Sequence, residues 1–215
     1  MSNLERRGLP ATEHPITESE DGKKFTGLAA VFNSPSEDLG GFVEYIDRRA
    51  FDHVLATNPD VVANWNHHDD DLLGRTSSGT LRLWTTEAGL HYELDPPDTT
   101  LGRDLRELLR RKDVTGSSFA FTVAKDKWEK RDGKKIRTVE KIGSLLDVAL
   151  VSSPAYSDAT VALRSLNKLE EEEAQAAEAE ETKDPERLSA ALRRAVYTSK
   201  AAVARATAEI TRNGG

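Results

Sequence analysis

Between Phe25 and Val151 the chain consists of short apolar runs and of stretches in which apolar and polar residues alternate, the two patterns typical of β-strands. Gly, Asn, Ser and Pro residues interrupt these runs and predict turns. The predicted strands lie in residues 25–32, 42–46, 61–65, 81–85, 90–94, 118–123, 128–139 and 145–151. Asp132-Gly133 lies in the middle of 128–139 and favours a hairpin with charged, exposed arms.

Two other segments have the spacing of amphipathic helices. In residues 48–56 and 101–109 the apolar side chains recur three or four positions apart, so that they share one face. Asp98-Thr99-Thr100 precedes the second segment and supplies residue types that cap a helix N-terminus. Since the predicted strands outnumber the helices, the fold class expected is mainly β with packed helices, α+β.

Composition divides the chain into three parts. Residues 1–22 are polar and predict a flexible leader or an edge strand, whereas residues 23–165 hold the apolar runs and predict the folded domain. In residues 166–215 a segment rich in Glu and Ala precedes a basic amphipathic segment that begins near Asp184-Pro185. This part predicts a charged helical tail, which is either solvated, a coiled-coil partner, or a docking and scaffolding segment.

The overall composition excludes several classes of protein. A length of 215 residues with 37% hydrophobic and 31% charged residues suits one domain plus an appendage. The absence of cysteine excludes disulfides, thiolate nucleophiles and cysteine-ligated zinc. A net charge of -7 argues against nucleic acid as the main partner. Because we find neither a signal peptide nor an apolar stretch of membrane-spanning length, we expect a soluble, cytoplasmic protein.

Three polar residues lie where core strands would hold them, and together they have the chemistry of a serine nucleophile. Ser118 begins a predicted strand, His67 follows the strand 61–65, and Asp147 is the only charge in the apolar run 145–151. A serine hydroxyl becomes an effective nucleophile when a histidine takes its proton, and a carboxylate orients and stabilises the imidazolium. Unrelated folds assemble this trio in different chain orders, so the order along this chain is acceptable.

Each of these residues also has a structural interpretation. The segment 116–118 is compatible with a simple helix-to-strand turn, His67 with a structural or surface histidine, and Asp147 with a buried partner of an arginine. The cluster from His67 to Asp71 contains the residue types of a metal site. Adjacent histidines in a strand point to opposite faces, however, and no second histidine-rich segment completes the cluster. We therefore expect neither a metal nor another cofactor.

Four separated motifs resemble those of the prohead (capsid maturation) proteases of tailed bacteriophages. The first, at residues 25–51, contains F-T-G-L-A-A-V-F-N-S and then G-F-V-E-Y-I-D-R-R-A-F. The second, N-H-H-D-D-D-L-L-G-R-T, resembles the histidine motif of the family and selects His67 rather than His68. The third, G-S-S-F-A-F, resembles the serine motif and selects Ser118, and the fourth, L-L-D-V-A-L-V-S-S-P-A-Y, selects Asp147.

The resemblance implies a fold and a set of roles. Prohead proteases are distantly similar to the herpesvirus assemblin serine proteases, so a β-barrel core of that kind is expected for residues 23–165. Ser118 would be the nucleophile, His67 the general base and Asp147 the residue that orients His67. The candidates for the donors to the oxyanion are the backbone around Gly116 and Ser117 and the side chain of Arg75.

The resemblance also implies substrates and a location. The expected function is a serine endopeptidase that cleaves the major capsid protein, its scaffolding segment and itself, inside the assembling prohead in the host cytoplasm. The tail is one candidate for removal by self-cleavage. Assemblin proteases form dimers, but no residue of this sequence shows whether this chain forms a homodimer. Neither nucleic acid nor a membrane is expected as a partner.

Two other functions compete with this one. The chain could be a non-catalytic internal scaffold with a degenerate protease fold, since a charged, alanine-rich tail suits that role equally well. A hydrolase that uses a metal at the His67–Asp71 cluster is the third alternative. The presence of all three polar residues argues against degeneracy, and a chelator separates a metal enzyme from a serine enzyme.

Overall fold

The computed structural model describes residues 4–9, 14–153, 165–172 and 174–175. The chain divides into two compact units, Met1–Ser165 and Leu166–Gly215. The first unit consists of two β-sheets and two helices, and it contains every predicted site residue. In the second unit the described residues are helical. Most of the predicted tail, including the basic amphipathic segment, lies outside the described residues.

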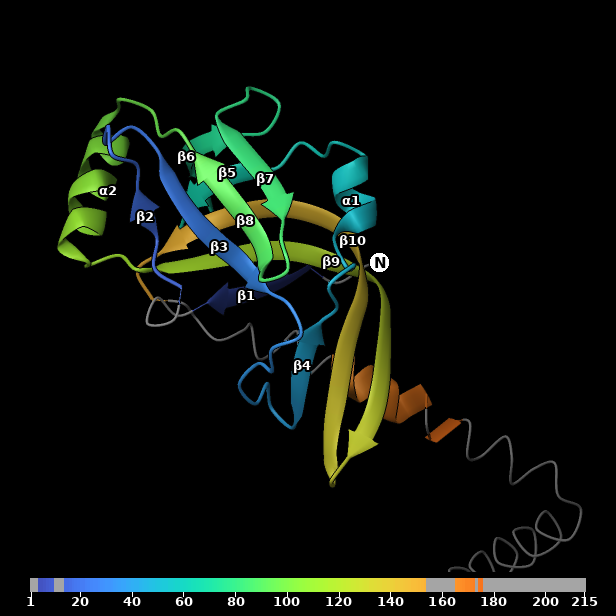
Figure 1. Ribbon diagram of the computed structural model, residues 1–215. Helices are drawn as coiled ribbons and strands as arrows, with labels where there is room; N and C mark the ends of the chain where they lie inside the picture. The colour runs from blue at the N-terminus through green and yellow to red at the C-terminus, as the bar shows by residue number, and fades with distance from the viewer. Residues whose placement is uncertain (1–3, 10–13, 154–164, 173, 176–215) are drawn as a thin grey trace, which may run out of the picture. The chain divides into compact units, whose positions relative to one another are not determined.

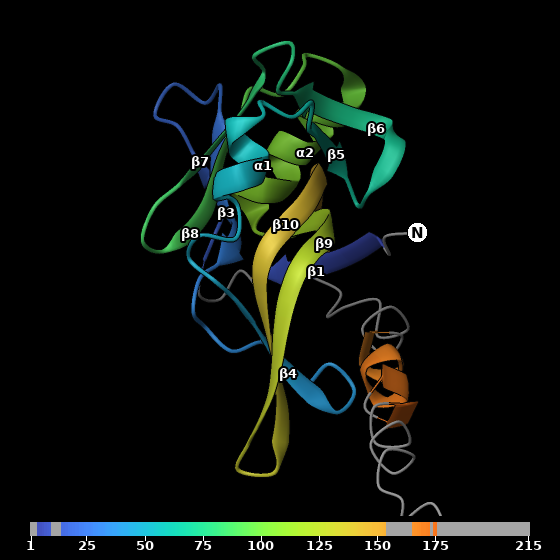
Figure 2. The ribbon, with the colours of Figure 1, turned by 90° about the vertical axis from the view of Figure 1, so that its right-hand side faces the viewer.

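The larger sheet has six strands. In spatial order they run β1 (Leu4–Leu9), β9 (Gly116–Arg131), β10 (Lys134–Val151), β5 (Val62–Trp65) and β6 (His68–Arg75), and β4 (Phe42–Ile46) pairs with the outer part of β10. Strands β9 and β10 form one long antiparallel hairpin that turns at Asp132-Gly133. Figures 1 and 2 show that this hairpin extends beyond the rest of the two-sheet body, with β4 alongside it.

The smaller sheet has four antiparallel strands in the order β2 (Thr17–Glu18), β3 (Phe25–Val31), β8 (Gly89–Leu94) and β7 (Leu81–Thr85). Helix α1 (Asp52–Ala56) follows β4, and helix α2 (Thr100–Arg111) connects β8 to β9. The Thr99 side chain accepts a hydrogen bond from the N–H of Gly102 and so caps α2, as the sequence predicts. Lys112 ends α2 in a left-handed conformation, and the chain then enters β9.

The core lies between the two sheets, because one face of each sheet is apolar. Phe119 and Phe121 of β9 stack on each other, and Phe51 packs against Phe119 from the start of α1. Tyr92 and Leu94 of β8 are fully buried in the same cluster. Alternate residues of β9 therefore face the core, which leaves Ser118 and Ala120 on the other face of the larger sheet.

The prediction of a mainly β fold with few helices is confirmed, and β3, β4, β5, β7 and β8 lie within one residue of their predicted bounds. The predicted segments 118–123, 128–139 and 145–151 are instead parts of the two long strands β9 and β10. The expected β-barrel core is not found among the described residues. No ladder among the described residues joins an edge of one sheet to an edge of the other, so the strands form two separate sheets rather than a closed barrel.

Residues 4–9, for which the sequence allows a leader or an edge strand, form the edge strand β1. Strand β6 follows the histidine directly and is not predicted by its polar sequence.

A buried ionic cluster fastens β1 to the rest of the sheet. Arg7 donates to both oxygens of Glu44 and to Glu5, and Arg137 donates to Glu5 and Glu44 in turn, at 2.6–3.0 Å. All four side chains are almost fully buried. Burial lowers the pKa of both arginines, but the hydrogen bonds and charges of the two glutamates outweigh it, so both pKa values lie above the ordinary one. Both arginines are therefore charged.

Candidate active site

His67 lies in the two-residue loop of the β5–β6 hairpin. Trp65 and His68 form the closing pair, and the loop residues Asn66 and His67 have φ angles of 52° and 60°. Two successive positive φ angles are the requirement of a type I′ turn, which matches the twist of the strands that it joins. Asparagine and histidine adopt positive φ more often than most non-glycine residues do, but the conformation is still uncommon for either of them.

Ser118 and Asp147 lie diagonally across the β9–β10 ladder. Ser118 is opposite Ala149, and Ala120 is opposite Asp147, so that all four side chains project from the same face. Diagonal neighbours on one face of a ladder are about 7–8 Å apart at Cα, a gap that an imidazole ring with a hydrogen bond on each side can bridge. The two alanines add little side-chain bulk between Ser118 and Asp147.

A bulge in β10 brings Asp147 onto this face. Leu145 is paired with Phe121, which faces the core, and Asp147 is paired with Ala120, which does not. In a regular strand residues 145 and 147 would share one face, but Leu146 is an extra residue between the two pairs. The bulge thus allows a core leucine and a site aspartate to lie two positions apart on opposite faces.

The three side chains form a continuous hydrogen-bonded chain. The Nδ1 atom of His67 lies 2.7 Å from an Asp147 oxygen, and the Nε2 atom of His67 lies 2.7 Å from the Ser118 hydroxyl oxygen. The side chains of His67 and Asp147 are only 11% and 10% exposed. A carboxylate that accepts from Nδ1 leaves Nε2 as the acceptor, which is the arrangement in which the imidazole can take the serine proton.

Strand β1 covers the outer side of the serine. Gly8 is the ladder partner of Ser118, and the Ser118 hydroxyl donates to the carbonyl oxygen of Arg7 at 3.0 Å. Ser118 is consequently only 4% exposed. The hydroxyl has one proton and two acceptors within reach, His67 and the Arg7 carbonyl, and it can donate to only one of them at a time.

The neighbouring serine has a different environment. Ser117 faces the core, where its hydroxyl lies 2.9 Å from the phenol oxygen of Tyr92. Burial raises the pKa of Tyr92 well above its ordinary value, and the hydrogen bond to Ser117 opposes that effect only in part. The phenol is therefore neutral, and the Ser117–Tyr92 pair is a structural hydrogen bond on the face opposite to His67.

The three candidates for oxyanion donors have different surroundings. Ser117 has ladder partners on both sides, Leu9 of β1 and Leu150 of β10, so its backbone lies within the sheet. Gly116 is paired with Val151 of β10, and among the described residues the last pair between β1 and β9 is Leu9 with Ser117. Arg75 contacts Asp60 at 3.4 Å through its side chain and Thr80 through its N–H, and none of its described contacts is to Ser118.

The acidic cluster next to His67 does not gather around one point. His68 contacts Asp71 at 3.4 Å, and Asp69 and Asp70 are exposed. Within residues 4–9, 14–153, 165–172 and 174–175 no group of three or more potential metal ligands is found. No helix in the described part of the chain is long and apolar enough to cross a membrane.

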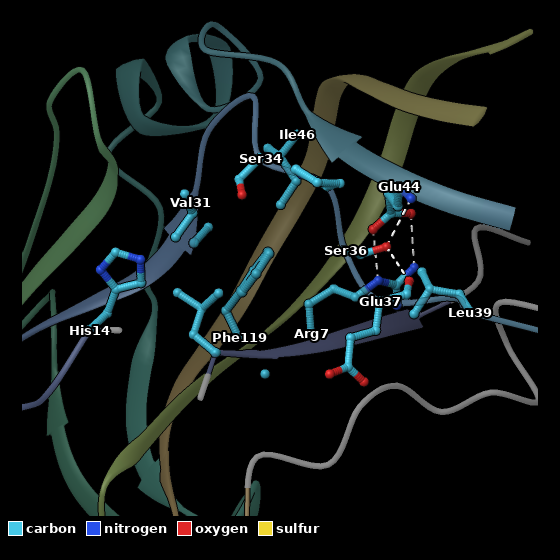
Figure 3. A pocket seen from close by; sticks show the side chains of 14 residues that line it. Arg7, His14, Val31, Ser34, Ser36, Glu37, Leu39, Glu44, Ile46 and Phe119 are labelled. Carbon is cyan, nitrogen blue, oxygen red and sulfur yellow. Dashed lines mark hydrogen bonds and ion pairs between the residues drawn. The ribbon is translucent and has the colours of Figure 1, made fainter. Parts of the chain in front are cut away.

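A cavity of about 230 Å³ lies on the other face of β9, between β1, β3 and the loop that leads into β4. Phe119 lines it together with Arg7, Val31, Ile46 and Glu44. Figure 3 shows the Phe119 side chain lying among these lining residues. Since successive residues of a strand point to opposite faces, this cavity is separate from the site of Ser118.

Comparison with known proteins identifies the chain. The model of the family described as Caudovirus prohead serine protease matches residues 11–174, more than half of the sequence. The chain belongs to this family. The resemblance that the four motifs indicate is thereby confirmed, and the protein is a serine protease of the phage prohead type.

The solved structure of the bacteriophage T4 capsid assembly protease is also similar to this prohead protease. The two are 13% identical, with a TM-score of 0.46, and the similarity covers 69% of this chain and 97% of the T4 chain. No curated protein matches the sequence.

Proposed function

We propose that this prohead protease cleaves peptide bonds of the capsid protein or its scaffold by means of Ser118, His67 and Asp147. The observation that carries the proposal is the hydrogen-bonded chain from Asp147 through His67 to Ser118, with two distances of 2.7 Å. A carboxylate, an imidazole and a hydroxyl in this order are the parts needed to activate a serine. The same geometry supports an active rather than a degenerate site.

In the proposed reaction Ser118 Oγ attacks the carbonyl carbon of the scissile peptide while His67 Nε2 takes the hydroxyl proton. His67 then gives this proton to the leaving nitrogen, and an ester between the substrate and Ser118 remains. Water attacks the ester, His67 takes a proton from the water, and that proton returns to Ser118. Asp147 keeps its charge throughout and stabilises the imidazolium.

The contact with Arg7 has to break before the first step. While the hydroxyl donates to the Arg7 carbonyl, it does not donate to His67, and β1 shields the oxygen from a substrate. Gly116 is our preferred oxyanion donor, because it begins β9 two residues before Ser118. Each such donor is typically worth about 10²–10³ in rate.

We infer the substrates and location from family membership. The capsid protein, its scaffolding segment and the protease itself are the proposed substrates, and the interior of the assembling prohead is the proposed place of action. Residues 166–215 include the proposed self-cleavage segment.

The experiment compares the wild type with the Ser118→Ala variant. Each is incubated with the cognate capsid protein, with and without a chelator, and the products are identified by intact mass. We expect cleavage by the wild type alone and no effect of the chelator. If both forms cut and the chelator stops them, the His67–Asp71 cluster is the site. If neither form cuts capsid protein or itself, the scaffold function is the better account.

A further inference from the structure

Asn64 is a fully buried amide on the face of the sheet that carries the candidate triad. It lies in β5 opposite Ala149 of β10, which in turn lies opposite Ser118 of β9. Paired residues of adjacent strands project to the same face, so Ser118, Ala149 and Asn64 form one row across the sheet. The hairpin loop with His67 begins two residues after Asn64.

The two halves of the Asn64 amide differ. Its Oδ1 atom accepts a hydrogen bond from the backbone N–H of His67 at 3.1 Å. Its Nδ2 atom is buried and has no hydrogen-bond partner among the described residues. A buried donor without a partner destabilises a fold, and an apolar side chain of similar size would remove that cost. The orphaned Nδ2 atom thus offsets part of what the Oδ1 contact with His67 contributes to stability, and the distinctive feature of the asparagine is that contact.

The contact helps His67 to keep an uncommon backbone conformation, with a φ angle of 60°. The N–H of Asn66 donates to the carbonyl of Leu150 at 3.0 Å, which ties the first loop residue to β10. The N–H of His67 is tied to the sheet by the side chain of Asn64. Both N–H groups of the loop are thus fixed to the same framework that holds Ser118 and Asp147.

We propose that Asn64 is a positioning residue for His67. It holds the backbone of His67 at positive φ and thereby aims the imidazole at Ser118, without itself touching the reacting atoms. The proposal rests on the function proposed above. The proposal predicts that removal of the Oδ1 acceptor lowers kcat and leaves KM nearly unchanged. The substrate site keeps its shape, but the imidazole of His67 is no longer held in the orientation that takes the Ser118 proton.

The test uses Asn64→Leu, with Asn66→Gly as the matched control. Asn64→Leu removes the unpartnered donor, which favours stability, and also the acceptor of the His67 N–H, which opposes it, so we expect a Tm near that of the wild type and a kcat about 10²-fold lower. Asn66→Gly removes an exposed hydrogen bond from the Ser152 N–H to the Asn66 side chain, but glycine adopts positive φ freely and keeps the N–H that contacts Leu150, so we expect a rate close to that of the wild type. If the leucine variant does not fold, Asn64→Ala gives the same readout per mole of folded protein.

A double-mutant cycle distinguishes positioning from other effects. In a His67→Ala background Asn64→Leu should cause no further loss of the residual cleavage rate, because its effect passes through His67. The proposal would be overturned if Asn64→Leu had the kcat of the wild type, or if it lowered the cleavage rate equally with His67 present and with His67→Ala. Neither result would affect the protease function, which cleavage by the wild type supports. If the wild type and Ser118→Ala behave alike, it is the proposed function that fails.

Discussion

Asp147 is buried beside His67, and its described hydrogen bond goes to the imidazole Nδ1 atom. The sequence leaves two interpretations of this residue, a member of the site and a partner of a buried arginine. In the structure the buried arginines Arg7 and Arg137 pair with Glu5 and Glu44 instead. The contact to His67 thus accounts for a charge inside an otherwise apolar run.

We predict that Asp147→Asn lowers kcat by about 10³–10⁴-fold and leaves the protein folded. An asparagine has the same shape, but its amide favours the imidazole tautomer in which Nε2 carries the proton and is unable to accept one from Ser118. The measurement is kcat on the capsid substrate, with a thermal unfolding curve as the control. A kcat within a few-fold of the wild type would exclude Asp147 from the catalytic chain.

The strands that carry the site show which features a sequence can predict. The positions of β5, β9 and β10 follow from apolar runs, and the motifs select His67, Ser118 and Asp147. The bulge at Leu146 is not predictable from hydrophobic alternation, because it is the interruption of that alternation. Asn64 is missed because one buried amide in an apolar strand gives no periodic signal; the orphaned Nδ2 atom is visible only in three dimensions.

The strand β1 is the element whose attachment is least expected from its sequence. The residues Glu5 and Arg7 look like part of a polar leader, yet both are buried by pairing with Glu44 and Arg137. None of these four charged side chains is stable in the core without the other three, so the cluster forms only when β1, β4 and β10 come together. A pattern of local residues does not reveal such a long-range ionic pairing.

We predict that Arg137→Met lowers the free energy of unfolding by about 3–5 kcal/mol, because it leaves Glu5 and Glu44 buried with one cation fewer. The matched control is Arg131→Met on the same hairpin, where an exposed arginine contacts Glu129 and the expected cost is below about 1 kcal/mol. Denaturant unfolding measures both. If both substitutions lower the free energy of unfolding by the same small amount, the ionic cluster does not stabilise the attachment of β1 to the sheet.

At the level of the whole molecule, the site belongs to one sheet, and the second sheet supports it. His67, Ser118 and Asp147 come from the β5–β6 loop, β9 and β10, which are neighbours in the larger sheet (Figure 1). The smaller sheet buries the opposite face, through residues such as Tyr92. The predicted mainly β fold is therefore correct, while the predicted barrel closure depends on edge pairing that hydrophobic patterns do not encode.

The central claim is that Ser118, and not the serine beside it, is the nucleophile. The most direct measurement compares cleavage of the capsid protein by Ser118→Ala and by Ser117→Ala, each checked by thermal unfolding. We predict no cleavage by Ser118→Ala with normal stability. For Ser117→Ala we predict retained cleavage, with a loss of about 1–3 kcal/mol because the Tyr92 hydroxyl is left without its partner. Cleavage by Ser118→Ala at the wild-type rate would contradict the account.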